Sequence, residues 1–291
     1  MARRANDPWP SQRRNAIQSA EAVVATIARS LPVDLNRIAA TRAVQRIEFT
    51  PLLTHGGLAV RNDGFIIYVR CDTGQNADLT GRFAEDGTGG SLPAAIARRA
   101  RFTIAHEIAH TFFYDIRRMP PRPKTQVHHG ALATKLEVAC NQIAGLILMP
   151  ETVMHRCFAN FDFVCPEELR TLTDRAMVSA EAVIHRFKHL GKLSHPEAIL
   201  ASVSRDGADW TISAISRHYS LRNILVDAKV GASIKALVDD PDFVLFGGET
   251  REAHARYIGH GGKRVMRFAC DIGFAPRRNR GVFIVGMPVL E

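Results

Sequence analysis

One short pattern in the chain combines residue types and spacing that can do chemistry, His106-Glu107-Ile-Ala-His110. On a helix, side chains four residues apart leave the same face one turn apart, so the two imidazoles can bind one metal ion. Glu107 is offset between them and can act as general base on a water whose pKa the metal lowers to about 7. A chain of this composition would contain the pattern by chance only about 0.02 times. We therefore interpret it as the motif of a zinc peptidase.

The residues around the motif predict a helix that is buried on one side. Ser91 and Pro93 supply a start signal upstream. Three polar residues of functional type on an otherwise apolar helix are costly to bury without a partner, and a metal would supply one. The apolar positions lie at helical spacing: Ile104, Ala105, Ile108, Ala109, Phe112 and Phe113.

A third metal ligand is expected downstream. Residues 135–149 predict a second core helix, which Pro150 ends. Glu137 near its start would complete a His, His, Glu site with one position open for water. Two alternatives stay open at this point. A carboxylate at the start of a helix is also favoured by the helix dipole alone, and His128 and His129 in the intervening Pro-rich loop are rival ligands.

Two sequence blocks together resemble the ImmA/IrrE family of zinc-dependent peptidases. The first is Arg-Phe-Thr-x-Ala-His-Glu-x-x-His from Arg101, and the second is Glu-x-x-x-Asn-x-x-Ala-x-x-x-Leu-Met-Pro from Glu137. The resemblance covers about residues 15–190. It implies that His106, His110 and Glu137 bind zinc and that Glu107 is the catalytic base. The chain departs from the family pattern only at packing positions: Ala109, Cys140 and Ile143.

The resemblance also implies a narrow protein substrate, a helix-turn-helix repressor whose cleavage releases stress-response or mobile-element genes. Zinc is the expected cofactor, and manganese and iron are alternatives because both accept two imidazoles and a carboxylate. Tyr114 and Tyr68 are close enough to the motif in sequence to be candidate transition-state stabilisers.

Composition and charge narrow the class of protein. The chain is 46% hydrophobic, with a net charge of +9 and a pI near 9.7. No apolar run reaches about 18 residues and the N-terminus lacks a signal-peptide pattern, which predicts a cytoplasmic protein without a membrane span. Five cysteines without a Cys-x-x-Cys pair argue against a disulfide framework and against a cysteine zinc knuckle. Positive charge suits an acidic partner or nucleic acid, and part of it could form a basic rim beside the motif: Arg98, Arg99, Arg101, Arg117, Arg118, Arg122 and Lys124.

Upstream of the motif, the hydrophobic pattern predicts helices over 12–30 and 35–44, followed by strands over 44–49 and 64–70. Turns are predicted at Gly56-Gly57 and Asn62-Asp63-Gly64, and a loop is predicted over 71–92. An edge of this small sheet could pair with an extended substrate backbone. Alternatively, the strands only cover the core.

Downstream, residues 166–175 and 179–190 predict two helices around a turn at 176–178. Such a helix-turn-helix unit could place Arg186, Lys188 and His189 in a DNA groove, or it could pack against the peptidase core. From residue 196 the pattern predicts strands over 198–204, 210–216, 224–226, 243–246, 264–269 and 282–285, with helices near 231–238 and 250–257.

The prediction is an α+β protein in three parts. A zincin-like peptidase core occupies 1–150, a helix-turn-helix-like segment 151–195, and a C-terminal α+β domain 196–291, called GAF-like and sensory by analogy only. The first functional hypothesis is a zinc metalloendopeptidase. The second is a DNA-binding transcriptional regulator with a structural zinc site, and the third is a toxin-antitoxin component.

Overall fold

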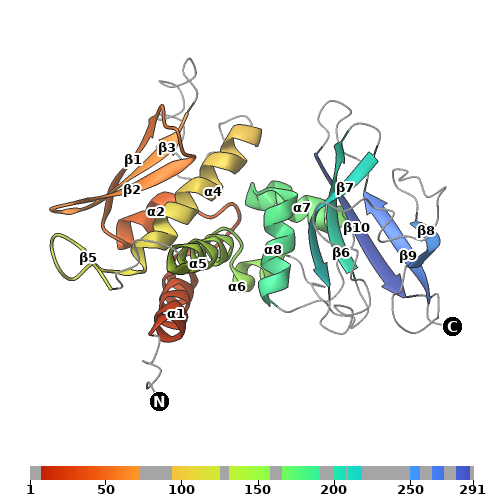
Figure 1. The fold of residues 1–291 in the computed structure, drawn as a ribbon, viewed down its shortest axis with the longest axis horizontal. Coiled ribbons are helices and arrows are strands. Elements are labelled where there is room, and N and C mark those ends of the chain that lie inside the picture. The colour runs from red at the N-terminus through yellow and green to blue at the C-terminus, as the bar shows by residue number, and fades with distance from the viewer. Residues whose placement is uncertain are drawn as a thin grey trace. The chain divides into compact units, whose positions relative to one another are not determined.

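A computed structural model describes residues 8–71, 94–124, 131–157, 166–190, 199–206, 209–217, 250–255, 264–271 and 280–288. Its internal contacts divide the chain into two units, Met1–Cys157 with Ala176–Val178, and Phe158–Arg175 with Ser179–Glu291 (Figure 1). Both units contain helices and a sheet, so the predicted α+β class is confirmed. The predicted boundaries at residues 150 and 195 stay predictions. His128, His129 and nearly all of the predicted 71–92 loop lie outside the described residues.

The first unit begins with two helices, close to the predicted ranges. Helix α1 spans Trp9–Ile27, and its buried Ala16, Ala20 and Val24 lie at four-residue spacing on the side that packs against α5. Helix α2 spans Leu35–Thr41. It begins where the Asp34 carboxylate accepts hydrogen bonds from the backbone N–H groups of the second and third residues after it, at 3.0 and 3.3 Å.

The sheet of this unit has three strands in the order β1-β3-β2. Strand β1 (Val44–Thr50) runs parallel to the central β3 (Gly64–Arg70), and β2 (Gly56–Arg61) pairs with β3 in an antiparallel hairpin. The predicted turn at Gly56-Gly57 is wrong, because these residues begin β2. Gly56 is needed there for close packing, since a Cβ at this position would lie 2.4 Å from Thr103 Cγ2 of the motif helix.

The two predicted core helices are confirmed. Helix α4 (Ala94–Thr111) carries the motif, packs on β2 and β3, and lies beside α5 (Ala131–Leu148), as Figure 1 shows. Helix α5 ends before Pro150 as predicted, and α6 (Glu151–Cys157) follows. The facing surfaces are apolar and fully buried, including Ile104, Ala105, Ile108, Ala109, Ala139, Cys140, Ile143, Ala144, Ile147 and Leu148.

One helical stretch in the described part of the chain, Leu132–Arg156, is long and apolar enough to cross a membrane by length and composition. Half of its most apolar window, 50%, is buried inside the protein. Because the stretch includes the helix-breaking Pro150 and the carboxylate of Glu137, we interpret it as the core helices α5 and α6.

Two cations fix the C-terminal end of α4. Arg42 donates from Nη2 to Thr111 O at 2.8 Å and from Nε to Thr111 Oγ1 at 3.2 Å, while its guanidinium lies 4.4 Å from the Phe112 ring centroid. Lys124 Nζ donates to Phe112 O at 3.1 Å. These donors satisfy carbonyls that the helix end leaves open, and their charge suits the negative end of the helix dipole. Two short strands, β4 (Tyr114–Asp115) and β5 (Arg122–Pro123), follow this end.

The second unit is built on a five-stranded antiparallel sheet of order β7-β6-β10-β9-β8. Its strands are β6 (Ile199–Asp206), β7 (Asp209–Arg217), β8 (Thr250–Ala255), β9 (Arg264–Asp271) and β10 (Arg280–Pro288). The predicted helix over 250–257 is wrong, because residues 250–255 pair with β9. Six residues are too few for a helix stable by propensity, so sheet pairing decides. The predicted elements at 224–226, 231–238 and 243–246 lie outside the described residues.

Two helices precede this sheet, α7 (Pro166–Ala176) and α8 (Ala180–Leu190), as predicted. Ser179 Oγ accepts a hydrogen bond from Ala182 N at 3.2 Å and so caps α8. Helix α8 packs on β6, β7 and β10. Arg186 of α8 is only 7% exposed, so its side chain is not available to a DNA groove as the helix-turn-helix hypothesis requires.

Candidate metal site

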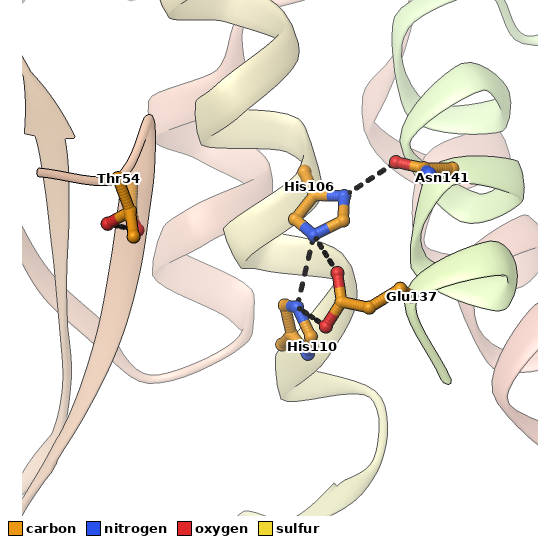
Figure 2. Close-up of polar contacts among 6 residues, drawn as sticks. Thr54, His106, His110, Glu137 and Asn141 are labelled. Atoms are coloured by element: carbon orange, nitrogen blue, oxygen red, sulfur yellow. Dashed lines mark hydrogen bonds and ion pairs between the residues drawn. The ribbon is translucent and has the colours of Figure 1, made fainter. Parts of the chain in front are cut away.

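Three of the predicted site residues meet where α4 and α5 pack together. The ligand atoms of His106, His110 and Glu137 all lie within 4.8 Å of one another (Figure 2). His106 Nε2 is 3.0 Å from Glu137 Oε2 and 3.1 Å from His110 Nε2, and His110 Nε2 is 3.5 Å from Glu137 Oε1. The helical spacing within α4 aligns the two imidazoles, and helix packing brings the carboxylate to them.

The geometry of this cluster suits a small metal ion. In a tetrahedral zinc site with ligand distances of about 2.0–2.1 Å, neighbouring ligand atoms are about 3.3–3.4 Å apart. The three observed separations lie at 3.0, 3.1 and 3.5 Å. Two imidazole nitrogens and a carboxylate therefore form a group that can hold a metal ion with little rearrangement.

Burial favours the neutral form of His110, which is the form that binds a metal ion. The pKa of His110 is lowered to about 4, first by burial and second by the charge of His106, with the Glu137 charge opposing both. A neutral imidazole at pH 7 has a lone pair free for a metal. The side chains of His106 and His110 are 16% and 19% exposed, whereas that of Glu137 is 54% exposed.

Asn141 is a neighbour of the cluster to which the sequence analysis gave no role. Its Oδ1 lies 2.9 Å from His106 Nδ1, on the side of the ring away from Glu137 (Figure 2). Asn141 follows Glu137 by four residues, so both side chains leave the same face of α5. That spacing was available in the sequence, but only the packing of α5 on α4 identifies the histidine as its partner.

Glu107 lies outside the three-residue cluster, between α4 and β2. It is 7% exposed, and its pKa is raised to about 7, first by burial and second by the negative charge of Glu137. A Cβ at Gly56 would lie 3.0 Å from Glu107 Oε1, so the first residue of β2 passes directly over this carboxyl. A carboxyl that titrates near neutral pH can both accept and return a proton.

The two candidate tyrosines do not join the cluster in the described part of the chain. Gly56 pairs with Val69 and faces α4, so Tyr68, paired with Gly57, points to the opposite face of the sheet. Its hydroxyl accepts a hydrogen bond from Arg61 Nη2 at 3.4 Å. The Tyr114 ring packs edge-on against Phe65 with centroids 5.2 Å apart, and burial raises the pKa of Tyr114.

The predicted basic rim needs one correction. Arg101 is fully buried and donates from Nη2 to Val33 O at 2.9 Å, linking α4 to the segment before α2. Its charge therefore does not reach a substrate. Arg99, by contrast, is exposed on α4.

Residues 96–188 match the family model of the IrrE N-terminal-like domain, a peptidase family. This segment belongs to the ImmA/IrrE family. It contains the motif of α4, all of α5 and the whole His106, His110, Glu137 cluster, so the resemblance found in the sequence is confirmed.

Two further comparisons concern the chain beyond this segment. A Mycobacterium tuberculosis transcriptional regulator of known structure is 16% identical, with 97% of this chain and 81% of that chain covered at a TM-score of 0.46. A similarity of this size carries no information about function. A search among curated proteins finds no match to the chain.

Proposed function

We propose that this protein is a cytoplasmic zinc metalloendopeptidase that cleaves a helix-turn-helix repressor and thereby derepresses stress-response or mobile-element genes. The observation that carries the proposal is the convergence of His106, His110 and Glu137 beside the buried Glu107, inside the family segment. His106, His110 and Glu137 would hold the metal. Manganese and iron are alternative occupants of the same three ligands.

Each residue has a distinct part in the hydrolysis. A zinc ion held there would supply Lewis-acid polarisation of the peptide carbonyl and a water of lowered pKa. Glu107 takes the proton from the attacking water and passes it to the leaving amine. The pKa of about 7 matches this double task, because the ionised and protonated forms are then both accessible at neutral pH.

Strand β2 is the proposed docking edge for the substrate backbone. It lies at one edge of the described sheet, and Arg70 N donates to His55 O at 2.9 Å. The alternation of an antiparallel ladder then directs the backbone groups of Gly56, Leu58 and Val60 away from β3. Thr54 Oγ1 donates to Gly56 O at 2.9 Å, as this direction requires. An extended peptide pairing here would pass beside Glu107.

The C-terminal unit is proposed as a GAF-like sensory domain, by analogy with family members. Its antiparallel sheet with α8 packed on one side is a self-contained α+β arrangement that supports this role. The DNA-binding regulator hypothesis is less well supported, since Arg186 is buried. The toxin-antitoxin hypothesis remains an alternative setting for the same peptidase chemistry.

The test uses the full chain, purified with zinc and incubated with helix-turn-helix repressors encoded beside its gene. Wild type should cleave one repressor at a single site, and Glu107→Gln should keep zinc while its cleavage rate falls roughly 10²–10⁴-fold. Elemental analysis measures the zinc and mass spectrometry of the fragments measures the cleavage. Equal cleavage by Glu107→Gln, or wild type that holds no metal, would contradict the proposal. Sequence-specific DNA binding without cleavage would favour the regulator hypothesis.

A further inference from the structure

We infer that Asn141 is a positioning residue for His106: its side-chain oxygen accepts the Nδ1 hydrogen and thereby turns the bare Nε2 toward the metal-binding cluster. The inference rests on the proposed function, since it assumes that the cluster binds a metal. Asn141 itself is not among the three ligands.

The geometry places Asn141 and Glu137 on two sides of one imidazole ring. Asn141 Oδ1 is 2.9 Å from Nδ1, and Glu137 Oε2 is 3.0 Å from Nε2 (Figure 2). Both distances lie in the hydrogen-bond range. Because the two side chains leave α5 one turn apart, a rigid helix sets their separation and the ring is oriented by both.

The chemistry decides which ring nitrogen carries the hydrogen. An amide oxygen only accepts, so the ring nitrogen that faces it carries a hydrogen. In a neutral ring Nε2 then carries the lone pair, and it faces the oxygens of the Glu137 carboxylate, which are also acceptors. Acceptors that converge at about 3 Å repel unless a cation lies among them. The opposite tautomer would place a hydrogen on Nε2 and block a metal.

An amide has an advantage over a carboxylate at this position. The site already contains two carboxyl groups, those of Glu107 and Glu137. A neutral acceptor fixes the tautomer without adding a third negative charge. Since Asn141 is exposed, its replacement should leave folding intact.

The experiment compares zinc affinities of the full chain by competition with a chelating indicator. Removing a partner of this kind typically lowers metal affinity about 10–100-fold. We expect a loss of that size in Asn141→Leu and an affinity within a few-fold of wild type in Asn141→Asp, because a carboxylate also accepts the hydrogen. Thr152→Leu is the matched control, an exposed neutral side chain on α6 beyond the far end of α5.

A second measurement needs no metal and no activity. Nitrogen-15 NMR of the metal-free protein, with His106→Ala to assign the signal, should detect the Nδ1–H tautomer of His106 in wild type and its loss in Asn141→Leu. Unchanged zinc affinity in Asn141→Leu, or equal losses in the Leu and Asp variants, would overturn the inference. If wild type binds no zinc, the proposed function fails. The NMR comparison then still decides, and an identical tautomer in wild type and Asn141→Leu overturns the role of Asn141.

Discussion

The polar groups at the C-terminal end of α4 and those of the neighbouring motif make contacts of different kinds. At the helix end, the oxygens of Thr111 and Phe112 meet the donors of Arg42 and Lys124, and every one of these contacts joins a donor to an acceptor. Just before this end, His106 and His110 meet Glu137, and these contacts join two ring nitrogens, whose role as donor or acceptor depends on the tautomer, to a carboxylate that only accepts. The two sets are similar in distance but differ in the kinds of groups that they join.

The difference separates a polar cluster that stabilises the helix end from one that could hold a metal ion. Complementary groups stabilise the fold as they stand, whereas a pair of imidazoles that meets a carboxylate with both ring lone pairs is stabilised only when a cation is bound. The same comparison predicts which variants should affect metal binding and which should affect only the free energy of unfolding.

The largest effect is expected from the cluster itself. His110→Ala and Glu137→Ala should each remove most of the zinc from the purified chain, because two remaining ligands hold the ion weakly. Elemental analysis of the three proteins side by side measures this. Full zinc in Glu137→Ala would show that another residue supplies the third ligand. The metal-binding cluster would then not be the one formed by His106, His110 and Glu137.

The buried carboxyl of Glu107 should make the stability of the metal-free protein depend on pH. Its pKa is raised from 4.5 to about 7, so the folded state binds more protons than the unfolded state between these values. The stability it contributes is therefore lost as pH rises through that window, by about 3 kcal/mol. The lowered pKa of His110 contributes an opposite change, a rise of stability with pH, in wild type and in Glu107→Gln alike. Urea unfolding at pH 5 and pH 8 should therefore show the free energy of unfolding of wild type falling relative to that of Glu107→Gln. Glu21→Gln, an exposed site on α1, should behave as wild type.

Gly56 tests whether β2 must lie close to the cluster. Gly56→Ala would place a methyl 2.4 Å from Thr103 Cγ2 and 3.0 Å from Glu107 Oε1, so β2 or the carboxyl must move. We expect cleavage to fall about 10–100-fold, while zinc affinity stays unchanged. Gly57→Ala is the control, since no atom lies within 4 Å of its Cβ position. Equal activity of both variants would mean that β2 does not position the carboxyl.

The smallest effect is expected at the helix end. Arg42→Met should lower the free energy of unfolding by about 1–3 kcal/mol, because it removes the donors to Thr111. Zinc affinity should remain within about twofold of wild type. Arg37→Met, on the exposed side of α2, is the control for lost charge. A large loss of zinc in Arg42→Met would show that the contacts at the helix end also affect metal binding. The two sets of contacts would then not be independent.

Local periodicity was enough to predict the helices of the cluster. The apolar spacing in α4 and α5, with Pro150 as a stop, gave both elements, and the motif spacing gave the histidine pair. Local pattern failed where a tertiary contact decides. The pair Gly56-Gly57 has the composition of a turn, but it begins a strand that α4 approaches closely. The segment Thr250–Ala255 was predicted as part of a helix, but it pairs with β9 as a strand. Asn141 gains a role only from a helix 35 positions away in sequence, which no local pattern reveals.

The unequal exposure of the three cluster residues has a consequence for how quickly an ion enters and leaves. At 54%, the Glu137 side chain is open to solvent, whereas the imidazoles are 16% and 19% exposed. A cation that binds here from solvent would meet the more exposed carboxylate before the imidazoles, and a departing ion would take the reverse route. The mobility of this one exposed side chain would then affect how quickly an ion exchanges, while equilibrium affinity depends on all three ligands.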